Sequence, residues 1–165
     1  TPTTLSPTAA PAQNVLVKYY VANNWERLPV AGLKSLTSYK QEMVETIDFR
    51  AGSGPFAGSE RSDNIAALFK GFLDFPSDGT STELCIVSDD GSKLYIDDSL
   101  EIDNDGLHGD KRVCKLLALS GPQKVTIEFF ERGGGATMVL EWKLAGSSLT
   151  VVPASAWVDA VSIFD

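Results

Sequence analysis

The segment "TMVLEWKL", residues 137–144, decides the class of fold, because its side chains alternate between large apolar groups and mostly polar ones. The first set is Met138, Leu140, Trp142 and Leu144, and the opposite set is Thr137, Val139, Glu141 and Lys143. Successive side chains of a β-strand point to opposite faces of a sheet. The spacing therefore predicts a strand with one buried face.

Further strands are predicted on the N-terminal side of this segment. "KVTIEF" (124–129) and "ALFKGFLDF" (67–75) alternate in the same way, and "VLVKYYV" (15–21), "ETIDF" (45–49) and "TELCIVS" (82–88) are short apolar runs. Glycine-containing turn signals separate them. Many short strands at this spacing favour an all-β fold, an antiparallel sandwich or barrel with little or no helix. The one helical candidate, "LKSLTSYKQEMVE" (33–45), lacks a strong cap, and we expect a loop or a single turn.

Length and charge limit the class of protein. With 165 residues, 43% of them hydrophobic, the chain is long enough for one well-buried domain. A net charge of −8 opposes the phosphate neutralisation on which nucleic-acid binding depends, so we expect no nucleic-acid partner. No apolar run approaches the roughly 18 to 20 residues that span a bilayer, so we expect a soluble protein without membrane insertion.

The N-terminal segment differs in composition from the rest of the chain. Residues 1–13, "TPTTLSPTAAPAQ", consist almost wholly of Thr, Pro, Ser and Ala. Such a composition is typical of a linker or of the end of a stalk in a secreted or wall-attached protein, and the alternative is a frayed terminus. We assign residues 1–13 to a linker and residues 14–165 to one folded domain.

Cysteine and histidine provide little support for catalysis or for zinc. His108 is the only histidine, no serine lies in a Gly-x-Ser-x-Gly setting, and the two cysteines match no zinc or Cys-x-x-Cys pattern. We therefore expect no enzymatic activity. Cys85 and Cys114 both lie in predicted strands, where they either form a disulfide across a sheet or remain separate buried thiols.

Acidic side chains are concentrated in "VSDDGSKLYIDDSLEID", residues 87–103. Calcium binds about six to eight oxygen atoms from carboxylates, carbonyl groups and water, so aspartates on loops are suitable ligands. Asp89 and Asp90 follow a continuous strand and precede a glycine. Neighbouring side chains of an extended trans peptide point to opposite faces, so a joint metal site here requires an unusual backbone. For the other aspartates, Asp97, Asp98, Asp103 and Asp105, turn chemistry is the favoured interpretation, with a second ion near the first three as the alternative.

Three longer motifs carry a resemblance to a family. "SDDGSKLYIDDSLEIDNDGLHG", "FFERGGGATMVLEW" and "VVPASAW" occur in this order, after "VKYYVANNWERLPV", and over Val15 to Trp157 the chain resembles the PA14 domain. The resemblance implies a β-sandwich. PA14 domains occur in toxins, as modules inserted into glycosidases, and in adhesins as calcium-dependent lectins.

The lectin members imply a site in this chain. In them, two consecutive aspartates joined by a cis peptide bind calcium together, and Asp89 and Asp90 match that pair. A second loop completes the site, and it corresponds here to residues 131–136, "ERGGGA", which lack the asparagine ligand of several sugar-binding members. The implied metal ligands are Asp89, Asp90 and backbone carbonyls of Gly133, Gly134 and Gly135. The implied sugar-contacting residues are Asp89, Asp90, Arg132, Asp105 and His108, with Trp25 a further candidate.

The functional expectation is a calcium-dependent carbohydrate-binding module of a larger extracellular or cell-surface protein. Its cofactor is expected to be Ca²⁺, its partner a glycan, and the domain itself monomeric. The alternative is a structural or protein-binding PA14 module without sugar binding of its own. The sequence does not identify the sugar.

Overall fold

The computed structural model describes residues 2–4 and 12–159, and these form eleven strands and two short 3₁₀ turns. In chain order the elements are β1 (Val15–Val21), η1 (Leu33–Ser35), β2 (Lys40–Val44), β3 (Asp48–Ala51), β4 (Ile65–Phe75), β5 (Thr82–Asp89), β6 (Ser92–Ile96), β7 (Ser99–Asn104), β8 (Lys111–Leu117), β9 (Gly121–Glu131), β10 (Ala136–Lys143), β11 (Thr150–Val151) and η2 (Ala154–Ala156).

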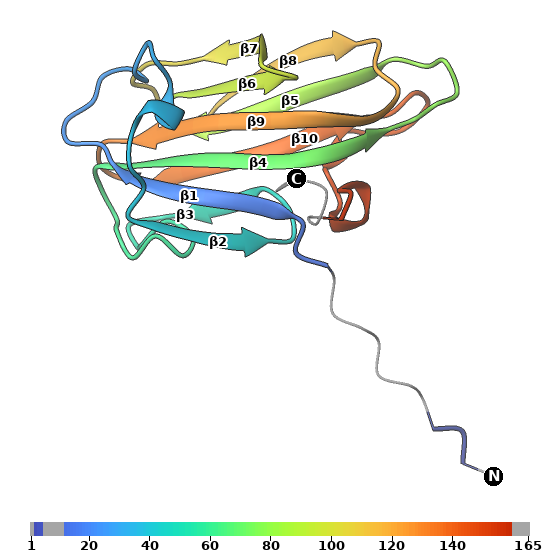
Figure 1. Ribbon diagram of the computed structural model, residues 1–165, viewed down its shortest axis with the longest axis horizontal. Coiled ribbons are helices and arrows are strands. Elements are labelled where there is room, and N and C mark those ends of the chain that lie inside the picture. The colour runs from blue at the N-terminus through green and yellow to red at the C-terminus, as the bar shows by residue number, and fades with distance from the viewer. Residues whose placement is uncertain (1, 5–11, 160–165) are drawn as a thin grey trace.

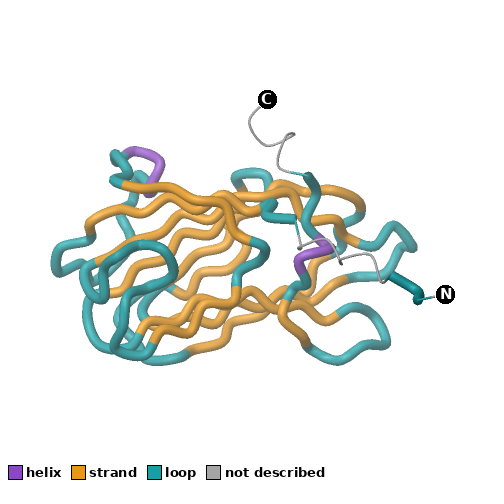
Figure 2. The backbone as a smooth tube through the Cα atoms, turned by 90° about the horizontal axis from the view of Figure 1, so that it is seen from below, coloured by secondary structure: helices purple, strands orange, loops and turns teal. Residues whose placement is uncertain are grey.

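The strands form two antiparallel sheets that pack face to face (Figures 1 and 2). One sheet has the order β2-β1-β4-β9-β6-β7, and the other has the order β11-β10-β5-β8, with β3 also pairing with β10. The predicted all-β fold is thus confirmed as a sandwich. The described residues contain no helix long and apolar enough to cross a membrane.

The core lies between the sheets and is made by the alternating apolar positions that the sequence displays. Buried side chains from β4, β9 and β10 include Phe69, Leu73, Phe75, Val125, Ile127, Phe129, Met138, Leu140 and Trp142. One expectation for β10 is wrong, because Thr137, Val139 and Glu141 on its other face are also buried. Side chains from elsewhere in the same sheet cover part of that outer face: Arg112 of β8 reaches across β5 and donates to Glu141 Oε1 at 2.9 Å.

Two segments depart from the predicted pattern of strands and loops. The segment 33–45 contains the single turn η1, as expected, but its second half forms the edge strand β2, whose burial pattern shows no alternation. The strand expected at 45–49 instead begins at Asp48, although Ile47 still bonds to β10, the strand with which β3 pairs. The Thr46 hydroxyl donates to the Val152 carbonyl at 2.6 Å, and the Ile47 carbonyl accepts from the Leu140 amide at 2.9 Å.

Cys85 and Cys114 form a disulfide, which settles the question that the sequence left open. They lie directly opposite each other in the register of β5 and β8. Most side chains of β8 are exposed, and no strand of the described chain covers its outer edge. The disulfide therefore ties an exposed edge strand to the centre of its sheet.

A second, smaller core covers part of the outer face of the six-stranded sheet. The loop between β1 and β2 folds over that face, and six buried residues of the loop and the sheet pack together: Tyr20, Ala22, Leu28, Leu33, Ala66 and Phe130. This loop, drawn in blue in Figure 1, reaches the end of the sandwich where β5 and β9 finish.

The two ends of the described domain lie at the opposite end of the sandwich. Val21 pairs with Ile65, which pairs with Glu131, so the start of β1 at Val15 is a strand's length away from Glu131 (Figure 1). Trp157 forms a bridge to Leu73, also far from that end. The predicted linker, residues 1–13, and the last residues of the predicted domain, 160–165, lie largely outside the described residues.

Candidate functional site

Asp89 and Asp90 lie at the turn from β5 to β6, and the peptide bond that joins them is cis. Asp90 is 8% exposed, and its two carboxylate oxygens accept bonds from two separate loops. The His108 amide donates to Oδ1 at 3.2 Å, and the Arg132 amide donates to Oδ2 at 3.0 Å. Asp90 thereby ties the loop after β7 and the loop after β9 to this turn.

The residues around the pair hold it firmly. At Gly91 an ideal Cβ would lie 2.6 Å from the Phe130 ring and 2.7 Å from the Gly106 amide, so only glycine fits there. The Gly91 carbonyl accepts from the Phe130 amide at 3.0 Å. Beneath the turn, the buried Ser88 and Ser92 hydroxyls lie 2.6 Å apart. The aspartates therefore sit on a rigid support.

Glu131 is the unusual group at this end of the sandwich. It continues the inward-facing set of β9 beyond Phe129 and is fully buried, yet neither carboxylate oxygen has a hydrogen-bond partner. Burial, followed by the negative charges of Asp63, Asp90 and Asp89, raises the pKa of Glu131 to about 8. A buried carboxylate without a partner is costly, so this corner of the molecule favours a cation.

Asp89 is in a similar electrostatic position. Burial raises the pKa of its carboxyl above the ordinary value, and the neighbouring charges of Asp90 and Asp110 add to the effect. The carboxylates of this corner do not form a set of three with oxygens within 4.8 Å of one another. The one such group found among residues 2–4 and 12–159 contains Glu83, Cys85 and Cys114, whose sulfurs are joined as a disulfide.

The glycine-rich loop between β9 and β10 lies beside the aspartates. Gly133, Gly134 and Gly135 are exposed, and Asp89 pairs with Thr137 at the start of β10. A depression of about 470 Å³ opens here. Its lining residues are Arg50, Ala51, Gly52, Asp89, Asp110, Gly135, Ala136 and Thr137. The aspartate turn and the glycine loop thus share one hollow in the surface.

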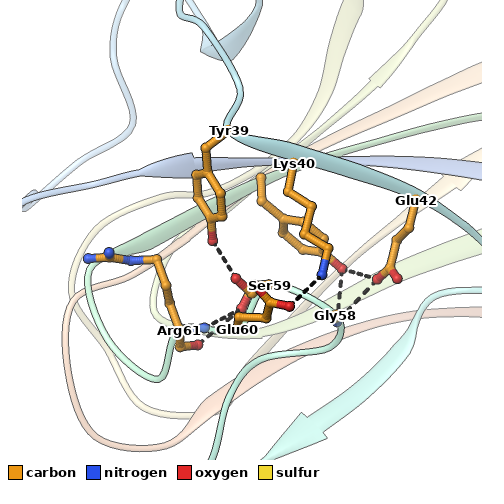
Figure 3. Close-up of polar contacts among 8 residues, drawn as sticks. Tyr39, Lys40, Glu42, Gly58, Ser59, Glu60 and Arg61 are labelled. Atoms are coloured by element: carbon orange, nitrogen blue, oxygen red, sulfur yellow. Dashed lines mark hydrogen bonds and ion pairs between the residues drawn. The ribbon is translucent and has the colours of Figure 1, made fainter.

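The loop between β3 and β4, which carries Asp63, is fastened by polar contacts (Figure 3). The Gly58 amide donates to the Tyr19 hydroxyl at 3.2 Å and to Glu42 Oε1 at 3.1 Å, and Tyr19 itself bonds Glu42. The Tyr39 hydroxyl donates to the Ser59 carbonyl at 2.8 Å. Nearby, Lys40 pairs with Glu60 at 3.2 Å. These contacts fasten the loop that carries Asp63 to β1 and β2.

The structure places the residues expected to contact sugar at this same end of the sandwich. Each of them has its own contacts within the protein. Arg132 is exposed, and its guanidinium lies 3.9 Å from Glu26. Both ring nitrogens of His108 lie 2.8 Å from backbone carbonyl oxygens, those of Gly109 and Asn104. The His108 ring is therefore engaged within its own loop.

Asp105 and Trp25 have partners inside the protein. The Asp105 carboxylate accepts from the Leu28 amide at 3.0 Å and lies 3.7 Å from the Lys93 ammonium group. The Trp25 ring packs on Phe130, with centroids 6.4 Å apart. Both side chains hold the loop between β1 and β2 against the sheet.

The remaining aspartates of the acidic stretch show turn chemistry. Asp97 and Asp98 both have positive φ, 47° and 67°, between β6 and β7, and such a two-residue turn matches the twist of a hairpin. Asp103 Oδ1 accepts from the Asp105 amide at 3.0 Å. These contacts agree with the interpretation that the sequence favoured for these residues.

Comparison with protein families decides the relationship. The family model described as the PA14 domain matches residues 13–156. The chain belongs to the PA14 domain family. No curated protein matches the chain.

Solved structures share the PA14 fold at low sequence identity. A "PA14 sugar-binding domain from RTX adhesin" is 17% identical with a TM-score of 0.71, over 89% of this chain and 98% of that one. The Epithelial Adhesin 6 A domain from Candida glabrata, solved in complex with Galb1-3GlcNAc, is 12% identical with a TM-score of 0.64, over 93% and 89%. An anti-sigma factor domain-containing protein is 19% identical with a TM-score of 0.74. The match covers 89% of this chain and 47% of that protein, so this chain spans about half of its length.

Sequence reasoning missed several residues of this site. Glu131 had a signal, because it continues the alternation of Val125, Ile127 and Phe129 and so places a charge at a core-facing position. Asp63 and Arg50 had none, since long-range pairing alone brings their segments to this end.

Proposed function

We propose that this PA14 domain is a calcium-dependent carbohydrate-binding module of a larger secreted or cell-surface protein. The observation that carries the proposal is the buried Glu131 carboxylate, which lacks a hydrogen-bond partner and lies in the field of Asp89 and Asp90. A divalent cation at this corner offsets the mutual repulsion of these groups. The fold shared with a sugar-binding adhesin domain supports a glycan as the ligand.

The donors present fit calcium better than a softer metal. Carboxylate and backbone carbonyl oxygens are ligands for Ca²⁺, whereas zinc sites use histidine and cysteine. Asp89, Asp90 and Glu131 would supply carboxylate oxygens, and Gly133, Gly134 and Gly135 would supply carbonyl oxygens from an exposed loop. The bound ion would supply Lewis-acid coordination for sugar hydroxyl groups.

The protein's own residues shape the place where a sugar binds. The lining of the depression beside Asp89 includes a cation, Arg50, and an acid, Asp110. Both groups hydrogen-bond hydroxyls well. Arg132 lies exposed on the adjoining loop, where its guanidinium, 3.9 Å from Glu26, is accessible to a longer glycan. Recognition by a few loop side chains around a rigid support is binding chemistry and involves no catalytic group.

The first test is thermal unfolding of the domain in excess chelator and across a calcium series. Calcium at about one hundred times its dissociation constant stabilises the folded state by about 2.7 kcal/mol, which raises the midpoint by several degrees. The variant Asp89→Asn should abolish this rise, because it removes a charge without disturbing the amide bonds to Asp90. The matched control is Asp74→Asn, which removes an exposed carboxylate from the outer face of β4.

The second test is a glycan array with and without calcium. We expect binding in calcium only, and its loss in Asp89→Asn but not in Asp74→Asn. Glycan binding that persists in chelator would exclude the metal-centred mechanism. A blank array, together with a calcium-dependent rise in the midpoint, would leave a metal-stabilised module with a protein partner.

A further inference from the structure

A second pocket lies away from the aspartate turn, on the outer face of the six-stranded sheet. It has a volume of about 300 Å³, at the lower end for small-molecule sites. It is lined by Val30, Ala31, Gly32, Lys34, Leu68, Lys70, Tyr95, Asp98, Lys124, Thr126 and Glu128. Outward-facing positions of β4, β6 and β9 form its floor, and the loop that carries η1 forms its rim.

Positive charge is concentrated at this pocket in a protein whose net charge is −8. Lys34, Lys70 and Lys124 line it from three different elements. They surround the exposed Asp98, which lies 2.8 Å from the Lys124 ammonium group, and all three lysines help to lower the pKa of its carboxyl. Asp98 and Glu128 together place two carboxylates against three ammonium groups, so one positive charge is in excess, which favours an anionic ligand.

The pocket also offers hydrogen-bond acceptors and an apolar wall. Glu128 is 6% exposed, and its Oε2 accepts from the Leu33 amide at 2.5 Å. Burial and the Glu128 carboxylate raise the pKa of Tyr95 to about 12, so its hydroxyl stays protonated. Leu68 and the Tyr95 ring supply apolar surface, and Thr126 adds a hydroxyl.

A small inorganic anion would use only part of these features. It would pair with the lysines, but it has no hydroxyl groups to donate to Glu128 and Asp98 and no carbon skeleton to cover Leu68 and Tyr95. A polyhydroxylated acid of about one sugar ring matches the lysines, the hydrogen-bond acceptors and the apolar wall. It carries a carboxylate, several hydroxyl groups and an apolar C–H face.

We propose that this pocket is a second, metal-independent binding site for an acidic sugar residue of the hexuronate type. Its carboxylate pairs with Lys34, Lys70 and Lys124, its hydroxyls donate to Glu128, and its C–H face packs on Tyr95. The site shares no lining residue with the depression at Asp89 and requires no calcium.

The test is a nuclear magnetic resonance titration of the labelled domain with D-glucuronate in excess chelator, where the calcium site cannot contribute. We expect saturable shifts of the backbone amides of Lys70, Tyr95 and Thr126. D-Glucose and sulfate should bind at least about tenfold more weakly, because each lacks part of the recognised chemistry. Lys70→Gln and Lys34→Gln should each weaken glucuronate binding by about tenfold.

The control is Lys143→Gln, which removes the same charge from the exposed end of β10 in the other sheet and should leave binding unchanged. Glucuronate that causes no shifts, or that binds Lys70→Gln and Lys143→Gln alike, would overturn the proposal. Sulfate that binds as tightly as glucuronate would reduce the pocket to a general anion site. A repeat titration in calcium that shifts Asp89, with no shifts at Lys70 in chelator, would assign the ligand to the other site and overturn the proposal.

Discussion

The substitution Glu131→Gln tests the electrostatic basis of the cation site, because it keeps the shape of the side chain and removes its charge. In the folded chain without metal, burial and three nearby carboxylates raise the pKa of Glu131 from 4.5 to about 8. The folded state therefore holds a proton that the unfolded state releases. The resulting stability is fully present below about pH 4.5 and is lost as the pH rises towards about 8. That difference in pKa corresponds to at most about 5 kcal/mol.

Urea unfolding between pH 4.5 and 8.5 in excess chelator measures this loss. The wild-type domain should lose several kcal/mol across the range, and Glu131→Gln should lose much less, with Asp89 accounting for the remainder because its pKa is raised too. Saturating calcium should flatten the wild-type curve and have little effect on the variant. A variant that keeps the full wild-type slope in chelator would show that Glu131 is not its source.

Three further predictions concern the scaffold, each checked by urea unfolding. Gly58→Ala should destabilise the domain by about 1 to 3 kcal/mol, because the added Cβ would displace the Glu42 carboxylate from its bonds to Tyr19 and to the Gly58 amide; an unchanged midpoint would mean that Glu42 moves aside without cost. Replacing both Cys85 and Cys114 with serine should cost about 2 to 4 kcal/mol, since the disulfide closes a loop with a sequence separation of 29; equal stability with and without reductant would contradict this. Asp105→Ala should cost about 1 to 3 kcal/mol through its lost buried hydrogen bonds, and a loss of glycan binding at full stability would instead make Asp105 a sugar contact.

The sequence predicted those parts of the fold that depend on local periodicity. Alternation in residues 67–75, 124–129 and 137–144 marked three long strands and the faces that they bury. It failed at β2, an edge strand without a fully buried face, where propensity and pattern are both weak. Alternation also could not show that Glu141 is buried, since Arg112, from a strand distant in the sequence, lies against it.

The candidate site was predictable where the chain itself brings groups together. Asp89 and Asp90 are adjacent in sequence, and the glycine loop joins two recognisable strands. Asp63 and Arg50 reach the same corner only through pairing with distant strands, which no short motif records. The disulfide was undecidable for the same reason, because the register between β5 and β8 determines whether Cys85 faces Cys114.

The position of β1 has a mechanical consequence. Val15 begins this strand at one end of the sandwich, the aspartate turn lies at the other, and β1 is hydrogen-bonded to β2 and β4 on its two sides. Tension applied between a ligand at the turn and the chain before Val15 runs along the strand axes, across hydrogen bonds that lie perpendicular to the strands. The two ladders of β1 then share the load at once instead of opening one bond after another, and the domain resists pulling in this direction more than it resists peeling from an edge.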